Sequence, residues 1–224
     1  MNPKPGNIIS RSLQQEHIIP DVIISKKDNK WLTELNPSIN PKIRINRAYE
    51  NLMKNISNKE DKEYVKTNLQ NARFFLKALK NRNLTILKVA KVVFKKQVSF
   101  LNQGDIAMKP LGLKDIAAEV DMHESTISRS TNNKYVQTPR GVYEMKHFFS
   151  SEINTDYGKM ISSTAIKSML EKIISKEDKG YPLSDSQIAD NLNKNGIRVA
   201  RRTVAKYREA LAIPPSKNRK KRSV

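Results

Sequence analysis

The chain has 224 residues and a net charge of +20, because 42 Lys and Arg residues face 22 Asp and Glu residues. This length fits one or two domains, and such an excess of positive charge predicts a polyanionic partner. The chain contains no cysteine, which excludes disulfides, thiolate zinc sites and cysteine nucleophiles and is compatible with a reducing cytoplasm. No apolar run approaches the roughly 18 residues of a membrane span, and residues 1–30 lack the apolar core of a signal peptide, so neither export nor membrane insertion is predicted.

The first half of the chain is predicted to form a small β-hairpin followed by helices. Residues 21–25 and 31–35 flank a polar stretch, which is typical of a hairpin. Neither Gly nor Pro occurs between Lys42 and Gln103. A short helix over 46–56 is therefore expected to end near a capping box at Ser57–Glu60.

A second helix is then predicted over residues 60–101, and at about 1.5 Å per residue it would span roughly 60 Å. The sequence Asn81-Arg82-Asn83 could divide this helix into two, so a single rod and a broken one both remain open.

A first helix-turn-helix pattern follows. Residues 113–120 form an amphipathic helix, residues 121–123 form a turn, and a second helix begins at Glu124 with Ile127 facing inward. The residues of this unit predicted to contact DNA are Ser125, Thr126, Ser128 and Arg129. A helical hairpin used only for packing is the alternative interpretation.

A second helix-turn-helix pattern lies near the C-terminus. Residues 187–192 form its first helix, and an Arg-rich helix begins at Ala200. On a helical wheel one arc is apolar and the opposite side is charged. The apolar arc holds Ala200, Val204, Tyr207 and Leu211, and the charged side holds Arg201, Arg202, Lys206 and Glu209.

The charged side of this helix suits the recognition of bases in a DNA groove. Ala205 lies among the charges and has little bulk, so the backbone can approach the groove floor while Arg201 and Arg202 reach guanine O6 and N7. The predicted DNA contacts of this unit are Arg198, Arg201, Arg202, Thr203, Ala205, Lys206 and Arg208. The alternative is a solvated basic face on an ordinary surface helix.

The remaining segments are predicted to be a linker and a basic tail, and they contain no motif for metal or nucleotide binding. The polar stretch 150–163 contains Gly158 and is predicted to be a linker, and residues 217–222 are predicted to form a disordered arm that binds phosphates. His17, His123 and His147 have no second histidine three or four positions away, so no metal site is expected. His123 is interpreted as a turn residue. No glycine-rich phosphate-binding loop occurs.

The ten residues 200–209, ARRTVAKYRE, match at every position the RpoN box that marks the sigma-54 family of bacterial transcription initiation factors. Other segments resemble the same family in the same order. They are Ile19–Val22, Leu35-Asn36, His123–Arg129, Lys134-Tyr135, Thr138–Gly141 and Phe148–Ser150. The resemblance covers nearly the whole chain and corresponds to about the C-terminal two thirds of a family member.

The resemblance implies a mainly α-helical promoter-recognition factor that is not an enzyme and needs no cofactor. It places the later part of a core-binding region in residues 1–103 and a helix-turn-helix for the downstream promoter element in residues 104–150. A linker at 151–163 and a domain for the upstream GG element at 164–224 follow. The implied partners are promoter DNA and the RNA polymerase core enzyme, in the cytoplasm and on the nucleoid.

The chain departs from the family pattern at its start. Members normally begin with a glutamine-rich activator-responsive region, a variable spacer and a first helical core-binding part, and residues 2–6 resemble a motif inside the core-binding region. We therefore expect this chain to recognise promoter DNA without supporting transcription that depends on an ATP-hydrolysing activator. Two alternatives remain: a tandem helix-turn-helix regulator that acts without polymerase, and a DNA-acting enzyme such as a recombinase.

Overall fold

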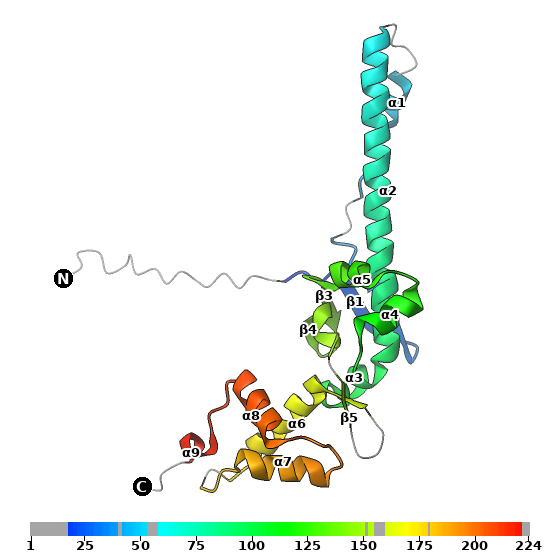
Figure 1. Ribbon diagram of the computed structural model, residues 1–224. Helices are drawn as coiled ribbons and strands as arrows, with labels where there is room; N and C mark the ends of the chain where they lie inside the picture. Colours follow the sequence, from blue (N-terminus) through cyan, green and yellow to red (C-terminus); the bar gives the residue numbers. More distant parts are fainter. Residues whose placement is uncertain are drawn as a thin grey trace, which may run out of the picture.

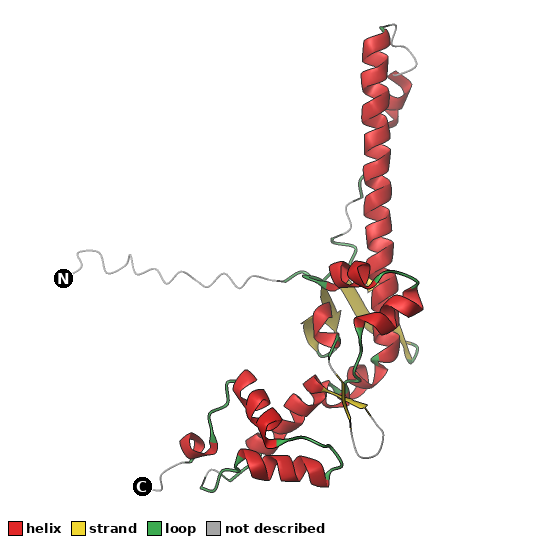
Figure 2. Ribbon diagram, viewed as in Figure 1, coloured by secondary structure: helices red, strands yellow, loops and turns green. Residues whose placement is uncertain are grey.

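The computed structural model describes residues 18–39, 42–52, 58–150, 152–154, 160–178 and 180–220. The chain is mainly helical with small β elements, which confirms the predicted fold class (Figure 1, Figure 2). One long helix rises from a central body, and a second group of helices lies at the C-terminal end (Figure 1). None of the helices in the described segments is long and apolar enough to cross a membrane.

The predicted hairpin is confirmed and belongs to a larger sheet. Strands β1 (Val22–Lys27) and β2 (Lys30–Leu35) pair antiparallel around Asp28-Asn29. Both turn residues have positive φ, 47° and 62°, which a tight turn of the favoured hairpin type requires. A second hairpin, which the sequence did not predict, extends the sheet in the order β2-β1-β3-β4. Its strands are β3 (Tyr135–Thr138) and β4 (Gly141–Glu144).

Asp21 fastens the N-terminal hairpin to strand β3, which runs parallel to β1. The backbone N–H of Asp21 donates to the Tyr135 carbonyl at 2.8 Å, and the Tyr135 N–H donates to Asp21 Oδ2 at 3.1 Å. The Lys134 ammonium lies 3.4 Å from Asp21 Oδ1, and both side chains are largely buried. The start of the described chain is thereby joined to the segment that follows the first helix-turn-helix.

The long helix is a single rod, and residues 81–83 do not interrupt it. Helix α2 (Lys59–Lys96) begins after Asn58, whose Oδ1 accepts the Glu60 N–H at 3.1 Å. The N-cap therefore lies one residue beyond Ser57, which is outside the described residues. Helix α1 (Arg47–Leu52) lies within the predicted 46–56 segment.

Only the C-terminal part of α2 is buried. Its buried residues are Ile86, Val89, Ala90, Val93 and Phe94. They pack with helices α4 (Leu113–Val120) and α5 (Glu124–Thr131) in the central body. The earlier residues of α2 project beyond this body (Figure 1).

Gln97 separates α2 from α3 (Val98–Gln103), so the helix ends earlier than the predicted residue 101. The fully buried Gln97 amide donates to the Lys109 carbonyl at 2.7 Å and accepts the Lys109 N–H at 3.0 Å. The chain then passes through the short helical turn η3 (Asp105–Ala107). A buried polar side chain thus ties the junction between α2 and α3 to the backbone of Lys109.

Aromatic rings close the core beneath α3. Phe148, in the turn η4 (Met145–Phe148), packs edge-on against Phe94 and Phe100 with centroids 4.8 and 5.0 Å apart. Such edge-to-face pairs add specific geometry to the burial of large apolar surfaces.

The C-terminal body has its own apolar cluster around Ile166, Leu170, Ile188 and Val204. Its elements are β5 (Glu152–Asn154), β6 (Met160–Ser162), α6 (Ser163–Ser175), α7 (Asp185–Lys194), α8 (Arg201–Ala210) and α9 (Ser216–Arg219). Strands β5 and β6 pair antiparallel, so the stretch predicted to be a linker contains paired strands on either side of residues 155–159.

The Gln97 corner generates a stability prediction. Gln97→Ala should lower the free energy of unfolding by about 2 kcal/mol, because it leaves the Lys109 N–H and carbonyl without partners in a part-buried site. Urea unfolding followed by circular dichroism measures the change. Gln103→Ala, at the exposed end of α3, is the control and should change stability by less than about 0.5 kcal/mol. Equal effects of the two variants would show that the buried amide has no special role.

Candidate nucleic-acid interface

The first helix-turn-helix is held by a tight turn and a histidine cap. Asp121 ends α4 in the left-handed conformation with φ of 56°, and His123 is the N-cap of α5. His123 Nδ1 accepts the Ser125 N–H at 3.2 Å and lies 2.8 Å from the Ser125 hydroxyl. His123 is therefore a turn residue, as predicted, and it satisfies an N–H that the first helical turn leaves unpaired.

Ile116 of α4 and Ile127 of α5 are fully buried and hold the two helices together. Of the residues predicted to contact DNA, Ser125, Thr126 and Arg129 are exposed, whereas Ser128 is half-buried. The structure thus leaves a small polar surface on α5 with a single guanidinium.

In the second unit a capping box starts α7, and Gly196 and Asn193 shape the turn that leads to α8. Ser184 and Gln187 form a capping box at the start of α7. Gly196, with φ of 78°, allows the chain to reverse, and Asn193 Oδ1 accepts the Val199 N–H at 3.0 Å. These contacts set the entry into α8.

The apolar arc predicted for α8 is confirmed for Val204, Tyr207 and Leu211, whereas Ala200, at the N-cap position, is exposed. Val204 is fully buried, and Tyr207 and Leu211 pack against the same cluster while remaining half-buried. Burial raises the pKa of the Tyr207 phenol above its ordinary value. The Lys167 ammonium lies 5.6 Å from the centroid of this ring.

The outward side of α8 brings three cations together. Arg201, Arg202 and Lys206 are exposed, and all three come from the first six residues of the helix. Thr203 and Ala205 lie between them and are half-buried. Arg198 is exposed just before the helix begins.

Arg208 does not belong to this outward face. The residue is only 5% exposed. Its Nε and Nη2 donate to the two oxygens of Asp185 at 2.9 and 3.3 Å, and its Nη1 donates to the Ile213 carbonyl at 2.8 Å. The prediction that Arg208 contacts DNA is therefore corrected: this guanidinium ties α8 to the start of α7.

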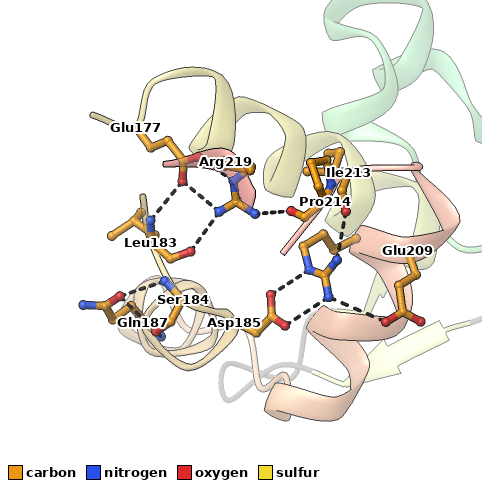
Figure 3. Close-up of polar contacts among 10 residues, drawn as sticks. Glu177, Leu183, Ser184, Asp185, Gln187, Glu209, Ile213, Pro214 and Arg219 are labelled. Carbon is orange, nitrogen blue, oxygen red and sulfur yellow. Dashed lines mark hydrogen bonds and ion pairs between the residues drawn. The ribbon is translucent and has the colours of Figure 1, made fainter. Parts of the chain in front are cut away.

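The C-terminal tail is ordered at least as far as α9, which corrects the prediction of a disordered arm from residue 217. Figure 3 shows Arg219 pointing between Glu177, Leu183 and Pro214. Its guanidinium binds both Glu177 oxygens at 2.6 and 3.0 Å and donates to the Leu183 and Pro214 carbonyls at 2.8 and 2.7 Å. Both charged side chains are almost fully buried.

The sequence did not predict these two arginine clamps. Asp185 precedes Arg208 by 23 residues, and Glu177 precedes Arg219 by 42. Acids near the ends of helices are ordinary surface features, so no local signal marks them as buried partners. Only the folding of α7 and α9 against α6 and α8 brings the charges together.

Two family models match the chain: the DNA-binding domain of sigma-54 over residues 62–221 and the core-binding domain of sigma-54 factors over residues 1–49. An RNA polymerase sigma-54 factor of Pseudomonas putida is 49% identical across 99% of this chain and 44% of its own length. The one of Escherichia coli K12 is 46% identical across 98% of this chain and 46% of its own length. The chain thus spans less than half the length of these relatives, not the two thirds that we expected.

A solved structure is similar as well. The crystal structure of Aquifex aeolicus sigmaN bound to promoter DNA has a TM-score of 0.57 and 34% sequence identity. The match covers 90% of this chain and 60% of that chain.

The Arg208 clamp gives a second stability prediction. Arg208→Ala should lower the free energy of unfolding by about 3 kcal/mol, because Asp185 is left as an unpaired charge that is only 18% exposed. Lys206→Ala, on the exposed side of the same helix, should cost less than about 0.5 kcal/mol.

The paired change Arg208→Met with Asp185→Leu should recover most of the loss, since removing both members of a buried pair leaves no orphan charge. Urea unfolding of the four proteins measures these differences. A double variant as unstable as Arg208→Ala would contradict the clamp.

Proposed function

The chain belongs to the sigma-54 family, and from this premise we propose that it guides RNA polymerase to promoters by recognising an upstream GG element and a downstream element. We assign the upstream element to α8 and the downstream element to α5. The matching core-binding domain at residues 1–49 supports an association with the polymerase core enzyme.

The observation that carries the proposal is the outward face of α8. Arg201 and Arg202 are exposed at the N-terminal end of the helix, where a recognition helix meets base edges in the major groove. Each guanidinium can donate two parallel hydrogen bonds to O6 and N7 of one guanine. Two adjacent arginines therefore suit two adjacent guanines, and Lys206 supplies a phosphate contact further along the helix.

Helix α5 offers weaker chemistry for the downstream element. Its exposed polar residues are Ser125, Thr126 and Arg129, so only one side chain can make the bidentate arginine contact. We therefore propose that α8 supplies most of the affinity, whereas α5 sets the position of the factor on the promoter.

The family resemblance also implies dependence on an ATP-hydrolysing activator. We accordingly propose activator dependence for the full-length family member and assign it to no residue here.

The assignment of α8 predicts a loss of base specificity. Arg202→Ala should weaken binding to a GG-containing duplex by about 1–3 kcal/mol and binding to a scrambled duplex much less. Fluorescence anisotropy with the two duplexes at one fixed salt concentration measures both affinities. Lys206→Ala is the matched control, and it should weaken both duplexes by similar factors because a phosphate contact carries no sequence information. If Arg202→Ala weakened both duplexes equally, the proposed role of α8 would fail.

A second prediction distinguishes the contributions of α5 and α8 to DNA affinity. Arg129→Ala should cost less affinity than Arg202→Ala, and its effect should concentrate on variants of the downstream element. Moving the two elements apart by about half of a 10–10.5 bp helical turn should abolish the effect of Arg129→Ala, because α5 would then face the wrong side of the duplex. Anisotropy on duplexes with both spacings provides the test. Binding that is indifferent to the spacing would favour a packing role for the first unit.

A further inference from the structure

Helix α2 carries eleven Lys and Arg residues, and nine of them share one face. When successive residues are rotated by about 100°, these nine fall within about 40° of a single line along the helix. They are Lys59, Lys62, Lys66, Arg73, Lys77, Lys80, Lys88, Lys91 and Lys95, and all are exposed. We call this set the basic stripe of α2.

No acid of α2 itself lies within the basic stripe. The three acids of α2, Glu60, Asp61 and Glu63, lie in its first turns and outside the line, and no acid occurs from Val65 to Lys96. The other two cations, Arg82 and Lys96, also lie outside the line. A solvated helix face normally mixes the two signs of charge, so this segregation indicates a surface suited to a polyanion.

The basic stripe faces away from the protein core. Ile86, Val89 and Val93 are buried on the other side of the same helix. At its C-terminal end the stripe meets the first helix-turn-helix, where Lys95 Nζ lies 3.7 Å from Glu119 Oε1 of α4. Lys96 binds the other oxygen of Glu119 at 3.0 Å, and this hydrogen bond lowers the pKa of that carboxyl.

The shape of the basic stripe favours a single strand over a duplex. From Lys59 to Lys95 it extends in a straight line for about 54 Å, with one cation per roughly 6 Å. The phosphates of a duplex spiral away from a straight rod within a fraction of a turn. A flexible single strand can follow the rod along its whole length.

Apolar side chains lie beside these cations. Phe74 is 76% exposed and lies about 80° around the helix from the line, next to Arg73 in the sequence, and Leu84 is 45% exposed within the line. Proteins that bind single strands combine a basic track for the phosphates with aromatic side chains on which bases stack. The bases of a duplex are already stacked and would leave Phe74 without a partner.

We propose that the basic stripe of α2, together with Phe74, binds a single strand of DNA beside the first helix-turn-helix. This role goes beyond the proposed function, which assigns only α5 and α8 to promoter DNA. It does not depend on the recognition of a GG element.

The test uses the full chain, a fluorescein-labelled oligothymidylate and a duplex of the same length. Lys77→Gln with Lys80→Gln removes two stripe charges from the projecting part of α2. It should flatten the log-log salt dependence of oligothymidylate binding by about 0.7 for each lost phosphate contact. Arg82→Gln with Lys96→Gln removes two charges from the same helix outside the stripe and should leave the slope unchanged.

Phe74→Ala supplies an independent measurement. It should weaken oligothymidylate binding about fivefold or more, because one stacked base is lost. Phe75→Ala, its neighbour on the other side of the helix and 58% exposed, is the matched control and should have little effect.

Circular dichroism confirms that each variant keeps its helical content. Equal flattening by the two charge pairs would mean that only the net charge of the chain matters, and this would overturn the proposal. A loss as large on the duplex as on the single strand would overturn it as well. The GG-specific assay of Arg202→Ala is independent of both outcomes.

Discussion

The structure depends on the burial of one side of α2. The five buried residues of this helix, which lie between Ile86 and Phe94, supply the apolar surface on which α4, α5 and the small sheet pack. Helix propensity alone gives a long rod only marginal stability in water, so this anchored end must hold the whole helix in place. The position of the first helix-turn-helix is therefore set by a helix that continues far beyond it.

The C-terminal body is small, and by our proposal its helix α8 must be held rigidly to recognise DNA. Its apolar cluster is limited, and two buried arginine-carboxylate pairs connect the elements around that cluster. Such pairs are costly to desolvate and their geometry is demanding, so they favour one arrangement of the helices over others. Arg208 holds α8 against the start of α7, so it fixes the position of the outward arginines but does not lie on their face. The same helix uses one guanidinium for structure and others, by our proposal, for recognition.

Sequence patterns over short stretches correctly predict the features that depend on residues close together in the chain. The hairpin around Asp28-Asn29, the two helix-turn-helix units and the inward positions of Ile127 and Val204 follow from periodicity and turn residues. The pairing of β3 with β1 did not, because each strand is short and their paired residues lie 114 positions apart. The sequence predicts that Arg208 contacts DNA together with the other cations of α8, because the pattern of one helix cannot show that Asp185 and Ile213 bind this guanidinium. For the same reason a run of basic residues predicts a disordered arm, although the side chain of Arg219 is only 9% exposed.

The break at Gln97 has a mechanical consequence. Helix α2 is about 57 Å long, and its buried residues lie near its C-terminal end, so a tilt of about 10° at that end would move the other end by roughly 10 Å. A polar amide bound to the Lys109 backbone holds the pivot, whereas continuous helical hydrogen bonds keep the arm stiff. A small rearrangement where α2 meets the first helix-turn-helix would therefore displace the far end of the helix by a much larger distance.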